Sequence, residues 1–197
     1  MATLGEVSNP DASVRRGSRP SSVAHILAMN LERTVSPQYS RLIPPPIQDM
    51  SDFIGATPLL RLWNLGTRDD LEVYGKLELF NPAGSAKDRT ARSLLRDAMA
   101  SGRVREGSLV VESSSGNLGI ALARACRLEG VRFLCIVDAR TNRSAVTAMK
   151  AYGAQVEVIW EPDPDLGDLL ATRRRRVAQI LAEVPGAVNL NQYENPA

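Results

Sequence analysis

The sequence has few of the residues that form covalent cross-links and metal centres. Its 197 residues include two cysteines and one histidine, too few for a disulfide framework or a Cys/His zinc site. No apolar run approaches the roughly 18 residues of a membrane-spanning helix, and no signal-peptide pattern opens the chain, so a reducing cytoplasm is expected. Lysine plus arginine (24) nearly balances aspartate plus glutamate (22), which gives no general reason to expect nucleic acid or an anionic membrane as a partner.

The composition is that of a globular protein, with 44% hydrophobic and 23% charged residues. Residues 1–50 differ from the rest, because turn and breaker residues such as Pro44, Pro45 and Pro46 recur there. We expect a flexible N-terminal extension over residues 1–50 and a folded region over residues 51–197. A mitochondrial transit peptide is the alternative for the extension, although its acidic residues speak against it.

After the extension, patterns typical of strands alternate with patterns typical of helices. In residues 85–101, for example, apolar residues recur with helical spacing at positions 91, 94, 95 and 98. Strand patterns cover residues 71–79, 108–112, 132–137 and 155–160, and helix patterns cover residues 85–101, 117–129, 143–152 and 166–183. This alternation predicts an α/β fold with an open, mostly parallel sheet and helices on both faces.

The first candidate site segment runs from Asn81 to Arg89 and joins a predicted strand to a predicted helix. Ligands of open parallel sheets bind where strands end and helices begin. Ser85 is the expected N-cap. Lys87 then lies in the first helical turn, where the helix dipole and Arg89 favour the neutral amine that Schiff-base chemistry requires. A surface lysine paired with Asp88 is the simpler interpretation, and a hydrolytic Ser85–Lys87 pair is a third.

The second candidate segment, residues 112–119, again joins a buried strand to a helix. Three serines, two glycines and an asparagine lie where backbone N–H groups converge, an arrangement suited to a carboxylate. The spacing matches neither the dinucleotide-binding nor the P-loop glycine pattern. An ordinary strand-to-helix turn with a serine N-cap is the alternative.

Together, the two segments make the chain resemble the pyridoxal-phosphate-dependent family of cysteine synthase and cystathionine β-synthase. The resemblance begins near residues 54–59 and extends to the C-terminus, with further matching stretches at residues 149–154 and 191–197. One branch is most similar, the synthases that join O-phosphoserine to glutamate on the way to 2,3-diaminopropionate, a siderophore precursor.

The resemblance implies the tryptophan synthase β-like architecture (fold type II) and pyridoxal 5'-phosphate as the cofactor. Lys87 would hold the cofactor covalently and later remove the α-proton of the substrate, and Asn117 would hydrogen-bond the cofactor ring oxygen. The substrate carboxylate would be bound by the serine-rich loop and two later residues: Ser114, Ser115, Gly116, Asn117, Gln192 and Tyr193.

The implied reaction is β-replacement on an activated serine, either O-phosphoserine or O-acetylserine, through an aminoacrylate intermediate. The expected nucleophile is an amino acid such as glutamate, and cysteine synthase activity with sulfide is the runner-up. Ser113, Ser114 and Leu118 depart from the residues common in cysteine synthases, which weakens the sulfide assignment. The resemblance also implies small-molecule amino-acid substrates and a homodimer.

The family normally continues well past this length and supplies a glycine-rich loop for the cofactor phosphate in its later half. Here only Gly167 and Gly186 follow Gly153. We therefore expect a truncated, N-terminal part of the enzyme that alone is inactive and exposes an apolar surface. A non-catalytic remnant or binding partner is the alternative from another class.

Four consecutive arginines, residues 173–176, lie on the last predicted helix. A solvated helix face is their ordinary explanation. Alternatively, Arg173 points into the cleft and binds a phosphate or a second carboxylate, since its planar guanidinium matches both. Trp63 and Trp160 are expected to be packing residues and not substrate platforms, and Cys126 and Cys135 are expected to be small buried hydrophobes. No metal ligand set is expected.

Overall fold

The computed structural model of the protein describes residues 49–63 and 71–192. These residues fall within one compact unit, Ile47–Ala197. The predicted extension over residues 1–50 lies outside the described residues except for its last two, and Tyr193 also lies outside them.

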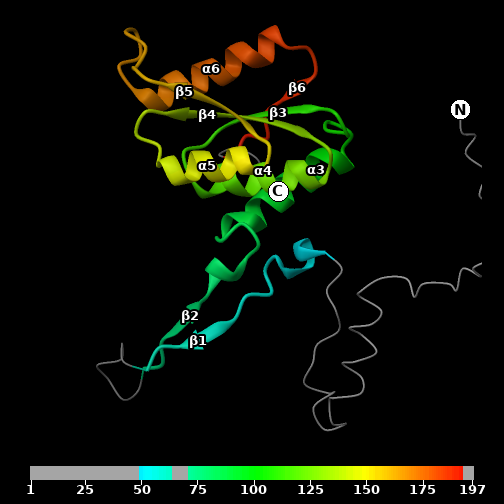
Figure 1. Ribbon diagram of the computed structural model, residues 1–197, viewed down its shortest axis with the longest axis vertical. Coiled ribbons are helices and arrows are strands. Elements are labelled where there is room, and N and C mark those ends of the chain that lie inside the picture. The colour runs from blue at the N-terminus through cyan, green and yellow to red at the C-terminus, as the bar shows by residue number, and fades with distance from the viewer. Residues whose placement is uncertain (1–48, 64–70, 193–197) are drawn as a thin grey trace, which may run out of the picture. The chain divides into compact units, whose positions relative to one another are not determined.

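The centre of the fold is a parallel sheet of four strands (Figure 1). The strands are β3 (Leu109–Ser113), β4 (Arg132–Asp138), β5 (Gln155–Ile159) and β6 (Ala187–Val188), in the spatial order β5-β4-β3-β6. In register, Val111 of β3 pairs with Leu134 of β4, and Leu134 pairs with Gln155 of β5. The chain leaves β3 toward β4 and β5 on one side and returns to β6 on the other side, so the end of β3 lies between the two halves of the sheet.

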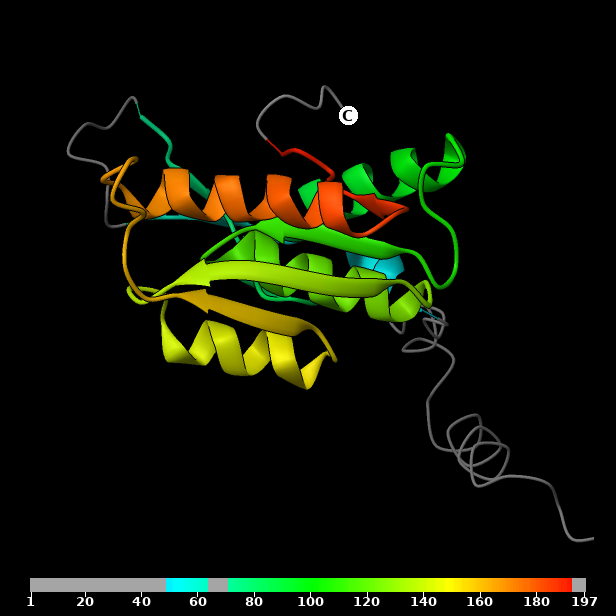
Figure 2. The same cartoon turned by 90° about the horizontal axis from the view of Figure 1, so that it is seen from above.

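Helices cover both faces of this sheet, which confirms the predicted fold class. Figure 2 shows α6 (Leu169–Glu183) on one face, and the layer on the opposite face contains α3 (Lys87–Ala100), α4 (Asn117–Leu128) and α5 (Arg143–Ala151). The larger core lies between the sheet and the three-helix layer, and includes Leu94, Leu122 and Met149. The smaller core lies under α6 and includes Val111, Ile136 and Val177.

Both cysteines are buried free thiols, as predicted. Burial raises the pKa of Cys126 and of Cys135 to about 12, so both thiols are protonated and inert at neutral pH. Among the described residues, no group of three or more His, Cys, Asp or Glu side chains could hold a metal ion. No helix in the same part of the chain combines the length and the apolar character needed to cross a membrane.

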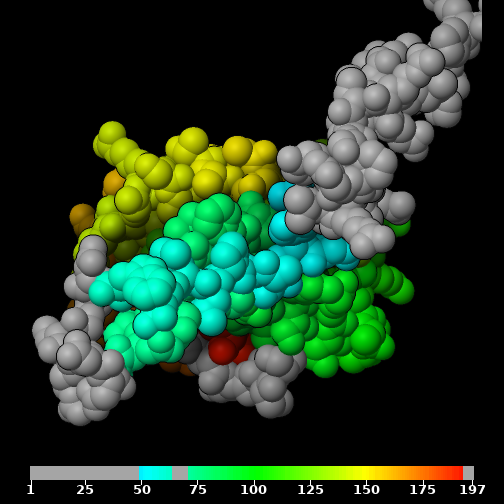
Figure 3. All heavy atoms as spheres, turned by 90° about the horizontal axis from the view of Figure 1, so that it is seen from below, coloured from blue at the N-terminus to red at the C-terminus, as the bar shows by residue number. Residues whose placement is uncertain are grey.

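A second, antiparallel pair of strands precedes the sheet. It contains β1 (Leu59–Arg61) and β2 (Tyr74–Lys76), flanked by the short 3₁₀ helices η1 (Met50–Phe53) and η2 (Glu78–Phe80). Figure 3 shows this segment, in cyan, along one face of the molecule. Its exposed large apolar side chains are Met50, Phe53, Leu59, Leu60, Trp63, Leu71, Tyr74, Leu79 and Phe80. The predicted packing of Trp63 and Trp160 is wrong, since each is 73% exposed.

Two predicted elements need correction, and two short strands were not predicted. The strand predicted over residues 71–79 is three residues of β2 followed by η2, because Glu78 turns back to contact Asn81 and Arg89. The last helix begins at Leu169 and not at residue 166, since the Asp168 carboxylate accepts a hydrogen bond from the Ala171 N–H at 2.8 Å. Neither β1 nor β6 was predicted, as strands of two or three residues carry no periodicity.

Candidate active site

The two segments predicted to carry the chemistry begin two neighbouring helices. Lys87 is the first residue of α3 and Asn117 is the first residue of α4. The turns that follow these helices are joined, because the Gly107 N–H donates to the Gly130 carbonyl at 2.9 Å. Helices of similar length that pack together and end at one edge also begin at one edge. That edge is the carboxyl edge of the sheet, since α4 directly follows the end of β3.

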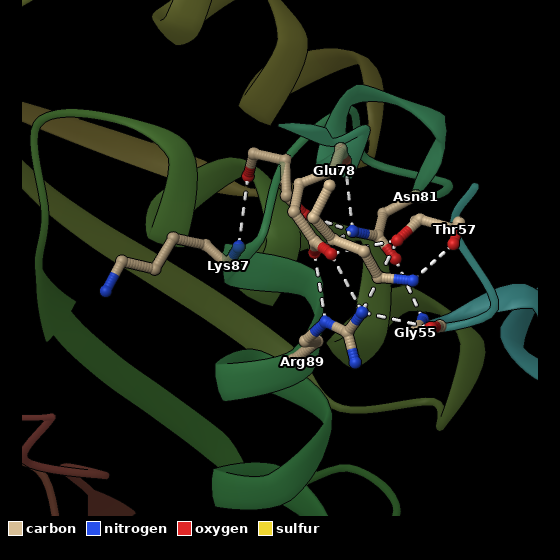
Figure 4. Close-up of polar contacts among 8 residues, drawn as sticks. Gly55, Thr57, Glu78, Asn81, Lys87 and Arg89 are labelled. Atoms are coloured by element: carbon tan, nitrogen blue, oxygen red, sulfur yellow. Dashed lines mark hydrogen bonds and ion pairs between the residues drawn. The ribbon is translucent and has the colours of Figure 1, made fainter. Parts of the chain in front are cut away.

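The Lys87 side chain is exposed at the start of α3. Ser85 does not cap the helix as predicted, because Ala86 occupies the N-cap position. Instead, the Ser85 hydroxyl accepts a hydrogen bond from the Lys87 backbone N–H at 3.2 Å. Figure 4 shows the Lys87 side chain pointing away from Arg89.

The Arg89 side chain is thus directed away from the Lys87 side chain (Figure 4). Residues two apart on a helix project from different faces. The Arg89 guanidinium instead forms a two-point ion pair with the Glu78 carboxylate, at 2.9 Å from Nε and 2.8 Å from Nη2. These hydrogen bonds hold the pKa of Glu78 at about 2, so the carboxylate is ionised throughout the neutral range.

Asn81 and Glu78 are central to the polar contacts behind Lys87, and sequence reasoning assigned them no role. Both side chains contact the chain before β1 as well as the turn before α3 (Figure 4). An asparagine before a proline is typical of an ordinary turn. The pairing of Glu78 with a residue eleven positions later follows no helical or strand period, so the sequence held no signal for it.

The loop at the start of α4 is fixed on its buried side by hydrogen bonds and close packing. The Ser114 hydroxyl accepts a hydrogen bond from the Gly119 N–H at 3.0 Å, and the Cys135 thiol donates to the Ser114 carbonyl at 3.1 Å. Gly119 lies so close to its neighbours that an added Cβ would be 2.7 Å from the Met149 sulfur and 3.2 Å from the Cys135 sulfur. The glycine is therefore required for close packing of α4 on β4 and α5.

The other side of the same loop is exposed to solvent. Ser115 and Asn117 are exposed, and Gly116 is half-buried. The N-cap Gly116 provides no side-chain cap, and no hydrogen bond within the described residues uses the backbone N–H groups of Asn117 or Leu118. Free N–H groups at a helix start attract anions, and carboxylate binding by this loop stays a prediction.

The segment after β6 returns to the end of β3. The Asn189 side-chain amide donates to the Val111 carbonyl at 2.7 Å, and the Gln192 side-chain amide lies 3.5 Å from the Ser113 carbonyl. Gln192 is thereby placed beside the strand that leads into the Ser114–Asn117 loop. These contacts bring together two predicted site segments that are far apart in the sequence.

A buried carboxyl group, that of Glu112, lies at this junction. Burial raises its pKa, and the Asn189 side chain together with the backbone N–H groups of Ser113, Asn191 and Gln192 opposes that rise. Glu112 was included in the predicted segment without a role of its own. Its position indicates that it anchors the returning chain to β3.

Arg173 is buried, only 7% exposed, whereas its neighbour Arg174 is exposed. The explanation of the arginine run as a solvated face is therefore wrong for Arg173. Its Nε lies 3.3 Å from an oxygen of Asp138, the last residue of β4. Its Nη1 is buried without a hydrogen-bond partner in the described residues. The end of β4 places this guanidinium on the same carboxyl edge as Lys87 and Asn117.

The chain is similar to two curated bacterial proteins called N-(2-amino-2-carboxyethyl)-L-glutamate synthase. The one from Ralstonia nicotianae is 46% identical over 145 residues, which cover 74% of this chain and 43% of the relative. The one from Cupriavidus metallidurans is 46% identical over 143 residues, which cover 73% of this chain and 42% of the relative. The chain thus spans less than half the length of either relative.

Solved structures give the same picture. An O-ureido-L-serine synthase matches with a TM-score of 0.67 and 35% identity, covering 77% of this chain and 46% of that chain. A hydrogen sulfide-producing enzyme from Fusobacterium nucleatum matches with a TM-score of 0.69 and 25% identity, covering 78% of this chain and 48% of that chain. The family described as pyridoxal-phosphate dependent enzymes matches residues 50–197, which include the whole candidate site, and the chain belongs to that family.

Proposed function

We propose that the protein catalyses pyridoxal-phosphate-dependent β-replacement on an activated serine and joins the amine of glutamate to it. The observation that carries the proposal is the placement of Lys87 and Asn117 as the first residues of two adjacent helices that begin at one sheet edge. The names of the two bacterial relatives support glutamate as the nucleophile.

The residues present fit the cofactor. Lys87 offers an exposed primary amine for covalent attachment, and Asn117 is exposed at the start of the next helix. When bound, the pyridine ring of the cofactor supplies an electron sink for the reacting amino acid. The protein would supply attachment and orientation, and the Lys87 amine would serve as the base for the α-proton.

The substrate carboxylate is proposed to bind at the start of α4. The free N–H groups of Asn117 and Leu118 and the exposed Ser115 hydroxyl provide donors on one side of the loop. The Ser114 hydroxyl accepts from Gly119, and its own proton remains available to the carboxylate. Gln192, and Tyr193 next to it, are proposed to complete the pocket from the returning segment.

Arg173 is proposed to bind the second acidic group of a substrate, the phosphate of O-phosphoserine or the side-chain carboxylate of glutamate. A buried guanidinium with an unsatisfied N–H favours an anionic partner strongly. Asp138 balances part of its charge and fixes its orientation.

The first test asks whether Lys87 binds the cofactor. The full-length gene product is incubated with pyridoxal phosphate, reduced with borohydride and digested, and the modified peptide is located by mass. We expect the label on Lys87 and its loss in Lys87→Ala, with Lys150→Ala as a lysine control on another helix. A label elsewhere, or an unchanged label in Lys87→Ala, would reject the proposal.

The second test identifies the substrates. O-phosphoserine and O-acetylserine are crossed with glutamate and sulfide, and the products are read by mass. We expect turnover of O-phosphoserine with glutamate. Turnover with sulfide alone would instead support a cysteine synthase, the runner-up. The Arg173→Met variant should raise the KM of the acidic substrate more than it changes kcat.

We further propose a homodimer, as the family resemblance implies, and a cytoplasmic location, in which the two unpaired thiols stay reduced. Light scattering of the full-length gene product tests the dimer, since a monomeric mass would contradict it.

A further inference from the structure

One end of the turn that precedes Lys87 is closed by a buried side chain, that of Asn81. Asn81, only 3% exposed, donates from its amide nitrogen to the Ser85 carbonyl at 2.9 Å and to the Glu78 carboxylate at 2.7 Å. Its amide oxygen accepts from the Gly55 N–H at 2.9 Å. One side chain thus ties together the end of η2, the chain before β1 and the turn from which α3 begins.

The same turn is closed from its other end by Asp88, the residue after Lys87. The two Asp88 carboxylate oxygens lie 3.0 and 3.1 Å from the Ala83 N–H, which donates to them. Burial raises the pKa of Asp88, and the hydrogen bonds from the Ala83 N–H oppose that rise. Residues 81–88 therefore form a loop whose backbone is fixed by side chains on both sides of Lys87.

The charged pair behind Asn81 holds the amide in one orientation. The Glu78 carboxylate accepts from Arg89, from Asn81 and, at 2.9 Å, from the Thr57 hydroxyl. Arg89 also donates to the Gly55 carbonyl at 3.0 Å. Every one of these groups lies on one side of the turn, while Lys87 extends to the other side (Figure 4). The network supports Lys87 without contacting its amine.

We propose that Asn81 is a positioning residue for Lys87, which sets the place of the reactive amine by fixing the Ser85 carbonyl and with it the first turn of α3. The inference rests on the proposed function, since it gives the Lys87 amine a cofactor to meet. A long, exposed lysine side chain has many rotamers, so only the position of its backbone can be defined in advance by the fold. Displacing that backbone by about 1 Å can slow a positioned reaction by about a hundredfold.

The experiment uses the full-length gene product and pyridoxal phosphate itself. Asn81→Ala removes the side-chain hydrogen bonds to Ser85, Glu78 and Gly55, and Asn81→Asp keeps the size and the acceptor for Gly55 but removes the amide donor to Ser85. Asn142→Ala is the matched control, because the Asn142 oxygen accepts from the Ser144 N–H at 2.8 Å and caps α5, a helix other than the one that carries Lys87. For the wild type and each variant, we measure the rate at which the borohydride-trapped adduct forms at Lys87. Hydrogen exchange of the Ala83 and Lys87 amides is measured in the cofactor-free proteins.

We expect Asn81→Ala and Asn81→Asp to slow adduct formation at Lys87 by about tenfold or more and to speed exchange of the two amides. Asn142→Ala should leave both readouts at the wild-type level. Wild-type rates in Asn81→Asp, with the protein folded, would overturn the positioning role. Absence of any adduct at Lys87 in the wild type would instead overturn the proposed function itself, which separates the two failures.

Discussion

The four-stranded sheet with its helices and the β1–β2 pair bury their apolar side chains to very different degrees. Leu122 in the middle of α4 is completely buried, whereas Leu59 on β1 is 63% exposed. The sheet is stabilised by apolar burial on both faces. The chain around β1 and β2 is attached to it through polar contacts, chiefly those of Glu78, Asn81 and Arg89. An exposed apolar surface of this kind is typical of an interaction surface.

The largest expected effect tests this comparison directly. Leu122→Ala should lower the free energy of unfolding by about 2–5 kcal/mol, because it leaves a cavity in the larger core. The same change at Leu59 should alter it by less than about 0.5 kcal/mol, as is usual at the surface. Urea unfolding of both variants measures the difference, and equal effects would show that β1 is as well packed as the sheet.

The next effect tests the close packing under the serine-rich loop. Gly119→Ala should destabilise the protein by about 1–3 kcal/mol, since the new Cβ would press on the Met149 and Cys135 sulfur atoms. The double variant Gly119→Ala/Met149→Ala should lose less stability than the sum of the losses in the two single variants. Strict additivity in the thermal unfolding of the three variants would mean that Met149 does not limit the space at Gly119.

A third effect concerns the junction between the two regions and depends on pH. The Glu78 pKa is lowered from 4.5 to about 2 by its hydrogen bond with Arg89. A carboxyl group with a lowered folded-state pKa stabilises the fold above its unfolded-state pKa and loses that contribution as pH falls. The wild type should therefore exceed Glu78→Gln in stability above about pH 4.5, and the difference should fade toward pH 2. A difference that stays constant from pH 6 to about pH 2 would exclude the ion pair as its source.

The smallest effect lies within β1 and β2. Arg61 of β1 pairs with Glu72, which precedes β2, and stacks 3.9 Å from the Trp63 ring centre. Arg61→Ala should cost about 0.2–1 kcal/mol, the usual range for exposed pairs. Arg103→Ala, in the region of the four-stranded sheet and its helices, breaks a comparable exposed pair with Asp97 and should cost about as much. A much larger loss for Arg61 would show that its pair contributes more than ordinary surface electrostatics.

The sequence predicted the sheet well and the polar attachments poorly. Apolar periodicity marks α4 and β4 because one face of each must be buried, and the positions of Lys87 and Asn117 followed from the strand-to-helix transitions. Arg173 could not be told apart from Arg174 in a run of four, because their burial depends on which face of α6 meets Asp138. The contact between Asn81 and Gly55 joins residues 26 positions apart, and that between Ser113 and Gln192 joins residues 79 positions apart. Pairings at such separations leave no periodic signal.

The shared direction of α3 and α4 has an electrical consequence. Their peptide dipoles point the same way, so the potentials at the two starting turns add and do not cancel. An approaching anion is drawn toward that edge before it touches any side chain, and dissolved salt limits the range of this attraction to about 8 Å at physiological ionic strength. A doubly charged anion and a zwitterion of similar size should therefore differ in how steeply added salt slows their association.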